Sequence, residues 1–256
     1  MPNRKFEVFE LICNEFRLRD ECILTNEFFS TELLQDLQDS FGALTPNAAI
    51  EKELQFLERH FKDRGATLPF SYDLISRQFK VLDREFIDFI TTVSSMRGQS
   101  RRGRQFEEAM CVRLRVRGVG QFHRVGWPRT RKKKRTQLLS HLRRLGFNSR
   151  VVYGKDKDGG LDIVWMLPFG AVPHRPLVSF QCKNGAFDIG EADKSYGPGI
   201  RSFSCHRGLQ NTVHTYCVIF NDYIEERNFG IKPFNFVMLG LSDLVSLDAP
   251  VKSVIL

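Results

Sequence analysis

The stretch Leu177–Gly185, LVSFQCKNG, begins like a buried strand and ends in polar side chains. Successive side chains of a strand point to opposite faces, so Phe180 and Cys182 share a face that suits a core. Gln181 and Lys183, the outer members of the QCK triplet, share the other face just before the strand ends. A lysine at a strand end is often a solvated terminus, so a functional interpretation requires partners elsewhere in the chain.

Short β-branched and aromatic runs precede and follow this stretch and predict a sheet. They are bounded by Gly, Pro, Asn or Asp and lie at residues 149–154, 161–167, 177–183, 212–220 and 234–241. A helix, three strands in meander order, a polar segment and a further strand indicate an α/β sandwich around a mixed sheet.

Helical spacing of apolar residues dominates the first part of the chain. The polar, glycine-containing stretch 96–105 is the best boundary, so we expect a helical N-terminal region over 1–96 and a second domain over 97–256. The expected helices lie at residues 6–16, 47–65, 84–96, 104–118 and 135–147. For the helix at 47–65, Asn47 is the candidate cap and Gly65 the candidate stop.

The composition supports a large core and argues against a membrane span. Apolar residues make up 42% of the 256 positions, and 23 phenylalanines indicate that aromatic packing fills much of the core. The sequence has no run of 18 apolar residues, and charges are scattered through its first 16 positions, unlike a secretory signal. We therefore expect a cytoplasmic protein.

The cysteines are interpreted as buried free thiols. The six cysteines form no CxxC pair, and four of them lie among apolar neighbours. A zinc site made from Cys205, His206, His214 and Cys217 is disfavoured, because the spacing of a metal finger is absent.

The net charge of +8 is distributed very unevenly along the chain. Residues 1–96 carry 11 Lys/Arg against 17 Asp/Glu, a net −6, and residues 151–256 carry 10 against 11, a net −1. Residues 97–150 carry 17 Lys/Arg against two acidic residues, a net +15. A basic excess this local favours a polyanionic partner such as nucleic acid. A solvated loop without a partner is the alternative for the heptad 129–135.

One carboxylate opens an apolar strand upstream of the QCK triplet. Asp162 precedes Ile163–Met166, IVWM, where a carboxylate is costly to bury unless it is paired or binds a cation. Gly159 and Gly160 just before it permit close backbone approach. A loop over 168–176 would return the chain as the next strand and set Asp162 beside the triplet. Carboxylate, amide and carbonyl oxygens would then form a Mg²⁺ site next to a lysine.

These motifs resemble the PD-(D/E)XK nuclease superfamily, whose fold is restriction-endonuclease-like. Its signature is an acidic residue that opens one strand and a D/E-x-K triplet on the next; the Mrr-type branch has a GDGGxD turn followed by QxK. This chain has DKDGGLD at Asp156–Asp162 and, 19 positions after Asp162, the QCK triplet. The superfamily also carries an acidic residue on a preceding helix, within GxxFE, and this chain has GRQFE at Gly103–Glu107. The resemblance covers residues 100–220.

Two features depart from the superfamily pattern. Gln181 replaces the commoner carboxylate, which removes a negative charge and argues against a two-metal mechanism. Some 27 residues, with a second helix among them, separate the GRQFE helix from the first expected strand, so Glu108 is the alternative to Glu107. Asp156 and Asp158 are interpreted as turn residues.

The resemblance implies Mg²⁺-dependent hydrolysis of DNA phosphodiesters on a mixed β-sheet flanked by helices. Asp162 would bind Mg²⁺ together with the Cys182 carbonyl and the Gln181 amide oxygen, and Glu107 would hold a metal-bound water. Lys183 would orient or help to deprotonate the attacking water and offset charge in the transition state. The side chain of Cys182 is interpreted as a packing group.

The leading hypothesis is a type II-like restriction endonuclease that cuts double-stranded DNA as a homodimer. An Mrr-like modification-dependent or anti-phage nuclease is the next hypothesis, followed by a junction resolvase or transposon end-cutting nuclease. A non-catalytic DNA-binding protein on the same fold is the alternative from another class. The N-terminal region would support dimerisation or recognition. The residues expected to contact DNA phosphates are Arg101, Arg102, Arg104, Arg129, Arg131, Lys132, Lys133, Lys134 and Arg135.

Overall fold

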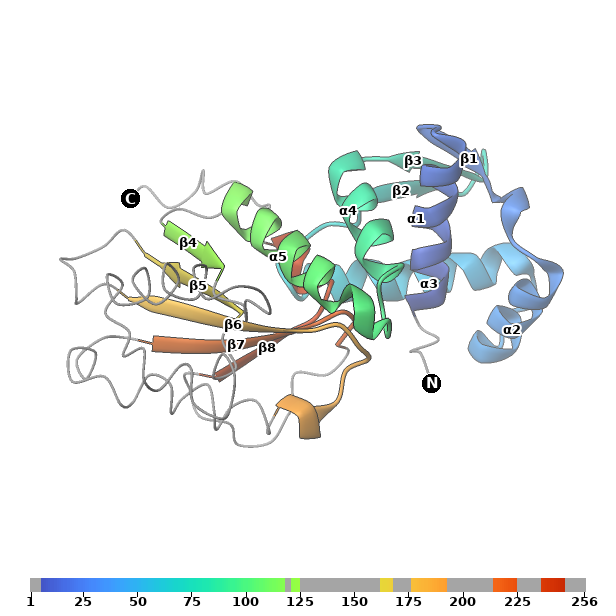
Figure 1. Cartoon of the computed structure of the whole chain (residues 1–256). Coiled ribbons are helices and arrows are strands. Elements are labelled where there is room, and N and C mark those ends of the chain that lie inside the picture. Colours follow the sequence, from blue (N-terminus) through green and yellow to red (C-terminus); the bar gives the residue numbers. More distant parts are fainter. Residues whose placement is uncertain are drawn as a thin grey trace, which may run out of the picture. The chain divides into compact units, whose positions relative to one another are not determined.

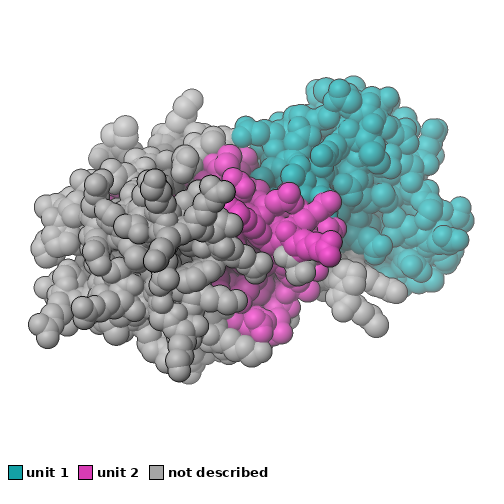
Figure 2. All heavy atoms as spheres, viewed as in Figure 1, with its two compact units in different colours: residues 1–95, 241–256 teal, residues 96–240 magenta. Residues whose placement is uncertain are grey.

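The structure is a computed structural model that describes residues 6–117, 121–124, 162–167, 176–192, 214–224 and 236–246. Over these residues the chain is a mixed α/β protein with two β-sheets (Figure 1). It divides into two compact units, coloured separately in Figure 2: unit 1, residues 1–95 with 241–256, and unit 2, residues 96–240. The sequence boundary at 96/97 differs from this division mainly because the C-terminal residues group with the N-terminal ones.

Unit 1 contains a small antiparallel sheet in addition to its helices. Its longer elements are α1 (Glu7–Arg19), β1 (Ile23–Thr25), α2 (Thr31–Phe41), α3 (Pro46–Lys62), β2 (Phe70–Asp73), β3 (Gln78–Val81) and α4 (Arg84–Ser94). The strands lie in the order β1-β3-β2, and both pairs are antiparallel. The expected helical character of the N-terminal region is present, but the three-stranded sheet was not expected.

Two helices of unit 1 follow each other through a short turn. Helix α2, which the sequence analysis missed, begins where the Ser30 side chain accepts a hydrogen bond from the Leu33 amide at 3.2 Å. It ends at Gly42, whose φ of 56° is left-handed. Helix α3 then starts at Pro46 with Thr45 as its cap, so the predicted cap at Asn47 is wrong.

The hairpin β2–β3 owes its shape to its turn residues. The Asp73 side chain accepts a hydrogen bond from the Ile75 amide at 2.8 Å, and Arg77 adopts a φ of 55°. Tyr72 pairs with Phe79 across the strands, with ring centroids 4.4 Å apart. The short alternating runs of these strands carry no helical period, which is why helical spacing did not reveal them.

Phenylalanine packing forms the core of unit 1, as the composition predicted. Seven phenylalanines are at most 2% exposed there: Phe6, Phe9, Phe16, Phe61, Phe70, Phe79 and Phe86. They come from helices and from the sheet, and the Phe9 ring lies 5.2 Å from Phe61 and 5.8 Å from Phe70 between centroids. Burial of these rings joins the helices to the small sheet.

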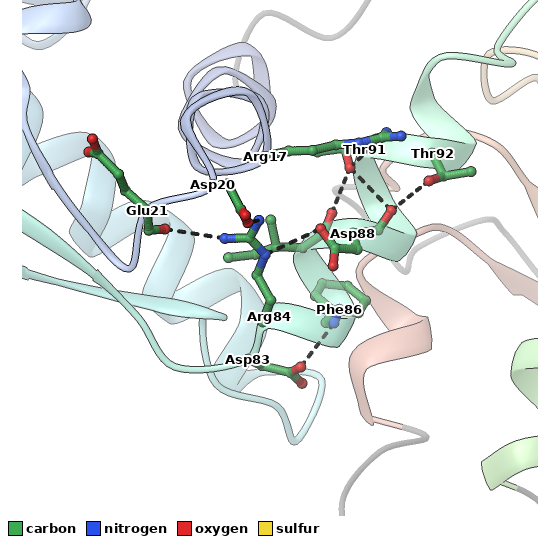
Figure 3. A network of polar contacts seen from close by, with 10 residues as sticks. Arg17, Asp20, Glu21, Asp83, Arg84, Phe86, Asp88, Thr91 and Thr92 are labelled. Carbon is green, nitrogen blue, oxygen red and sulfur yellow. Dashed lines mark hydrogen bonds and ion pairs between the residues drawn. The ribbon is translucent and has the colours of Figure 1, made fainter.

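Arg84 connects the start of α4 to the end of α1 (Figure 3). Its guanidinium pairs with Asp20 at 2.6 Å and donates to the Glu21 carbonyl at 3.2 Å. Asp88, one turn further along α4, lies 3.4 Å from the same guanidinium. The Asp83 side chain caps α4 by accepting from the Phe86 amide at 2.9 Å.

The C-terminal described residues belong to unit 1 through buried polar contacts. His60 Nε2 lies 2.8 Å from the Ser242 hydroxyl, and Arg64 Nε lies 3.2 Å from the Asp243 carboxylate at the start of α9 (Asp243–Ser246). Arg64 Nη1 also donates to the His60 carbonyl at 2.9 Å. Buried groups of this kind require each other as partners.

Unit 2 is built on a five-stranded mixed sheet within the described residues. Its strands are β4 (Gln121–Arg124), β5 (Ile163–Met166), β6 (Leu177–Lys183), β7 (His214–Phe220) and β8 (Phe236–Leu239), in that order across the sheet. The pairs β4–β5 and β5–β6 are antiparallel, and β6–β7 and β7–β8 are parallel. The predicted mixed sheet is confirmed. Helix α5 (Gly103–Arg117) packs on β4 and β6 (Figure 1).

Strand β4 was missed in the sequence, and it changes the relation between α5 and the sheet. Only residues 118–120 separate α5 from β4, so the GRQFE helix is followed directly by a strand of the sheet. Strand β4 occupies the edge of β5 that was assigned to residues 149–154. That expected strand and the expected helix 135–147 lie outside the described residues.

All five described cysteines are free thiols: Cys13, Cys111 and Cys217 are buried, Cys182 is partly buried and Cys22 is exposed. Cys205 and His206 of the disfavoured zinc set lie outside the described residues.

Of the helices that the structure describes, none has the length and apolar character needed to cross a bilayer.

Candidate active site at the ends of β5 and β6

The pairing of β5 with β6 brings Asp162 beside the QCK triplet. Ile163 lies opposite Phe180, and the Asp162 amide donates to the Phe180 carbonyl at 2.9 Å. Asp162 is 6% exposed, and its Oδ2 accepts a hydrogen bond from the Cys182 amide at 2.7 Å. A charge-assisted bond of this length offsets part of the cost of burying the carboxylate.

Gln181 is held by a buried tyrosine of the neighbouring strand. The hydroxyl of Tyr216, a fully buried residue of β7, donates to the Gln181 amide oxygen at 2.9 Å. The two strands are parallel, with Ser179 opposite Tyr216. This bond fixes the orientation of the Gln181 amide, so its oxygen occupies a defined position beside the sheet.

Lys183 pairs with an acidic residue that the sequence analysis did not select. The Lys183 ammonium lies 3.4 Å from Glu191 Oε2, and both side chains are partly exposed. Glu191 lies on a helical turn capped by Asp188, which accepts from the Gly190 amide at 2.7 Å. The run DIGE offered a capping signal for this turn, but the motif pattern gave no reason to connect it with Lys183.

Glu107 lies on α5, on the side of the sheet where Cys182 points. Burial raises the pKa of the Cys182 thiol well above its usual value, and the negative charges of Asp162 and Glu107 raise it further. The positive charge of Arg124 lowers the same pKa. With its pKa raised in this way the thiol stays protonated at neutral pH, which suits the predicted packing role.

Arg124 on β4 is the cation of this group, and the sequence analysis missed it. Its guanidinium lies 3.3 Å from Glu107 and 3.6 Å from Glu108, and it donates to the Arg104 carbonyl at 3.2 Å. The alternatives Glu107 and Glu108 thus share one partner. The side chain of Glu107 is 24% exposed and that of Glu108 65%, so Glu107 is the more enclosed carboxylate.

The predicted catalytic residues therefore fall into two groups around the ends of β5 and β6. Glu107 lies on the Cys182 side of β6, whereas Gln181 and Lys183 point to the opposite face by the alternation of the strand. The Asp162 carboxylate, bonded to the Cys182 backbone, lies between these groups. The expected convergence of all four side chains on one point is only partial in this arrangement.

The oxygen donors of this site fit Mg²⁺ as a weakly held ion. No group of three or more His, Cys, Asp or Glu side chains close enough to hold a metal occurs among the described residues. Mg²⁺ is commonly bound through one or two carboxylates together with substrate phosphates, and keeps several waters. The Asp162 and Glu107 carboxylates match that limited set.

Some of the predicted DNA contacts are described and some are not. The side chains of Arg101, Arg102 and Arg104 are exposed around the start of α5. The heptad with Arg129, Arg131, Lys132, Lys133, Lys134 and Arg135 lies outside the described residues, as do Asp156, Asp158 and the Gly159-Gly160 pair.

Comparisons of the chain with protein-family models, with curated proteins and with solved structures found no match.

Proposed function

We propose that this chain is a Mg²⁺-dependent endonuclease that hydrolyses DNA phosphodiesters, with a type II-like restriction endonuclease as its most specific form. The observation that carries the proposal is the Asp162 carboxylate, which is buried and bonded to the Cys182 amide one residue from Lys183. A buried carboxylate, a second carboxylate on α5 and a lysine at a strand end can supply metal ligands and a cationic group for metal-assisted phosphodiester hydrolysis.

In this proposal Asp162 and the Cys182 carbonyl would bind the metal, and Glu107 would hold a metal-bound water. Bound Mg²⁺ supplies Lewis-acid polarisation of the phosphate. Tyr216 keeps the Gln181 amide in one orientation. Lys183 orients the attacking water and offsets the negative charge that develops on the phosphoryl oxygens.

Glu191 gives Lys183 a partner before DNA binds. The ion pair is partly exposed, so it is weak and a phosphate group can replace it at little cost. The lysine is therefore held near its working position by the protein itself. Arg124 likewise forms an ion pair with Glu107, and a bound cation would compete with Arg124 for this carboxylate.

DNA is the expected substrate because of the local positive charge. Residues 97–150 carry a net +15, and Arg101, Arg102 and Arg104 expose their side chains within that segment. Contacts between such side chains and phosphates provide affinity without sequence information.

Helices α2 and α3 of unit 1 also favour DNA as the partner. Helices α2 and α3 contact each other and are joined by the turn at residues 42–45, an order of elements that a helix-turn-helix shares, and the β2–β3 hairpin follows. In DNA-binding proteins the second helix of this motif enters the major groove. The exposed face of α3 carries Gln55 and Arg59, side chain types that recognise adenine and guanine. Residues 1–96, which include most of this unit, have a net charge of −6, so the unit would contribute specificity rather than electrostatic affinity.

The test is a cleavage assay on plasmid DNA with purified protein. Unmethylated and methylated plasmids are incubated with Mg²⁺ or with EDTA, and the products are separated on a gel. Discrete fragments from unmethylated DNA, absent in EDTA, are expected. Cutting confined to methylated DNA would favour the Mrr-like nuclease, and binding without cutting would favour the non-catalytic protein. Sedimentation of the free and DNA-bound protein tests the proposed homodimer.

A further inference from the structure

The chain segment that leads into α5 is tied to the end of β6 by one asparagine. Asn184 follows Lys183 directly, and its side-chain amide donates to the Met96 carbonyl at 2.7 Å and to the Gln99 carbonyl at 3.1 Å. Its own carbonyl accepts from the Gly98 amide at 3.0 Å. Three hydrogen bonds therefore connect one residue to the backbone of residues 96–99.

A second asparagine, at the end of β7, holds the first one in place. The Asn221 amide nitrogen Nδ2 donates to Asn184 Oδ1 at 2.7 Å, and the backbone amide of Asn221 donates to the Lys183 carbonyl at 2.9 Å. Arg97 Nε donates to the Asn221 carbonyl at 2.6 Å. Asn221 is fully buried, so this contact is shielded from water.

The chemistry of this pair requires an amide at position 184. Two backbone carbonyl oxygens face Asn184 Nδ2, and each needs a donated hydrogen, while Oδ1 must accept the hydrogen of Asn221. Aspartate has nearly the same shape but only acceptor oxygens, so it would face both carbonyls with a negative charge. Asn184→Asp therefore removes the two hydrogen bonds to the Met96 and Gln99 carbonyls with the least change in side-chain volume.

The segment held in this way continues into the exposed arginines. The Arg102 amide donates to the Gln99 carbonyl at 2.8 Å in the turn η3 (Ser100–Arg102), and α5 starts at Gly103. Arg101, Arg102 and Arg104 thus follow directly on the anchored residues. The hydrogen bonds of Asn184 thus tie the start of this segment to the residue that directly follows Lys183.

We propose that Asn184 and Asn221, here called the asparagine clamp, are positioning residues that hold Arg101, Arg102 and Arg104 as a binding site for backbone phosphates next to the scissile one. This inference rests on the proposed DNA nuclease function. It adds to that function a defined phosphate site and the residues that keep it in register with Lys183.

The test measures the salt dependence of DNA binding in Ca²⁺ or EDTA, so that no cleavage is needed. Each phosphate contact contributes about 0.9 to the slope of log affinity against log salt. Replacing Arg101, Arg102 and Arg104 by glutamine should lower the slope by about 2.7 if all three contact phosphates. Asn184→Asp should lower it by at least about one unit while leaving these arginines in place. In the triple glutamine background, Asn184→Asp should cause no further loss, because it acts through the arginines.

The matched control is Asn14→Asp, which adds the same charge on the exposed surface of α1 and should leave the slope unchanged. All variants are measured at a temperature where circular dichroism shows that they are folded. An unchanged salt slope for Asn184→Asp would overturn the inference, and so would a decrease in slope that adds to that of the triple variant. Cleavage of DNA by the wild-type protein would still support the nuclease in either case. A lowered slope in a protein that never cuts DNA would keep the clamp and reject the nuclease. Absence of any DNA binding would reject both.

Discussion

Replacement of Asp162 separates its structural contribution from its proposed chemical one. In Asp162→Ala the Cys182 amide loses its acceptor, the carboxylate oxygen at 2.7 Å, in a site where Asp162 is only 6% exposed. An orphaned buried donor costs about 1–3 kcal/mol, so the free energy of unfolding should fall by about 2 kcal/mol. Asp162→Asn keeps an oxygen at the same place and loses only the charge assistance, so it should cost about 1 kcal/mol.

The two variants should behave alike toward cations, although they differ in stability. A ligand that binds only the folded protein stabilises it by about 2.7 kcal/mol at a concentration of 100 times its dissociation constant. Wild-type protein should gain stability as Mg²⁺ is added, and both variants should gain much less. Urea unfolding, followed by circular dichroism over a series of Mg²⁺ concentrations, measures both effects.

Two results would refute this reasoning at different points. Equal stability of Asp162→Ala and Asp162→Asn would show that the Cys182 amide does not depend on the carboxylate. Undiminished Mg²⁺ stabilisation in Asp162→Asn would move the metal site away from this residue, and Glu107 would be the next carboxylate to replace.

Three further changes test other parts of the account. Gln181→Glu adds a carboxylate near Asp162 and should tighten Mg²⁺ binding in a calorimetric titration; weaker binding by the folded variant would show that position 181 faces away from the metal. Gly240→Ala would place a Cβ 2.8 Å from the Asp222 carbonyl oxygen and should cost about 1–3 kcal/mol of unfolding free energy, whereas an unchanged denaturation midpoint would refute this packing. Alkylation of native protein at about pH 8 should label Cys22 before Cys182, whose pKa is raised by burial, and mass spectrometry would detect the reverse order.

Each of these changes has a matched control in the chain. Gly185→Ala meets no atom within 4 Å of the added Cβ and should leave stability nearly unchanged. Tyr216→Phe removes the donor to Gln181 without adding charge, so it should loosen the amide but not tighten Mg²⁺ binding. For the thiols, unfolding in urea should make Cys182 react as readily as Cys22.

The sequence predicted those elements whose periodicity is long or strongly apolar. Helices α1, α3, α4 and α5 and strands β5 to β8 contain such runs, and their positions are confirmed within a few residues. Strands β1 to β3 have only three or four residues each, and β4 lies in a basic stretch where neither alternation nor an apolar run is visible. Short strands depend on their sheet neighbours rather than on local pattern, so their sequences carried too little signal.

That Asp162 lies beside the QCK triplet could be predicted from the strand order, because adjacent antiparallel strands place the start of one beside the end of the other. The partners of those residues could not be predicted in the same way. Tyr216, Arg124 and Asn221 contact Gln181, Glu107 and Asn184, respectively, across 17 to 37 positions of sequence. Nothing in the local composition of these positions distinguishes a site residue from an ordinary core or surface residue.

The central claim is that Lys183 acts in metal-dependent cleavage of DNA, and single-turnover kinetics on plasmid DNA test it most directly. Wild-type protein, Lys183→Ala and Glu191→Gln are compared at saturating protein concentration with Mg²⁺, after their DNA affinities are measured in Ca²⁺. Lys183→Ala should bind DNA within about tenfold of wild type and cleave it about 10²–10⁴-fold more slowly. Glu191→Gln, which removes only the partner of the lysine, should stay within about tenfold of the wild-type rate. Cleavage by Lys183→Ala at the wild-type rate would contradict the account.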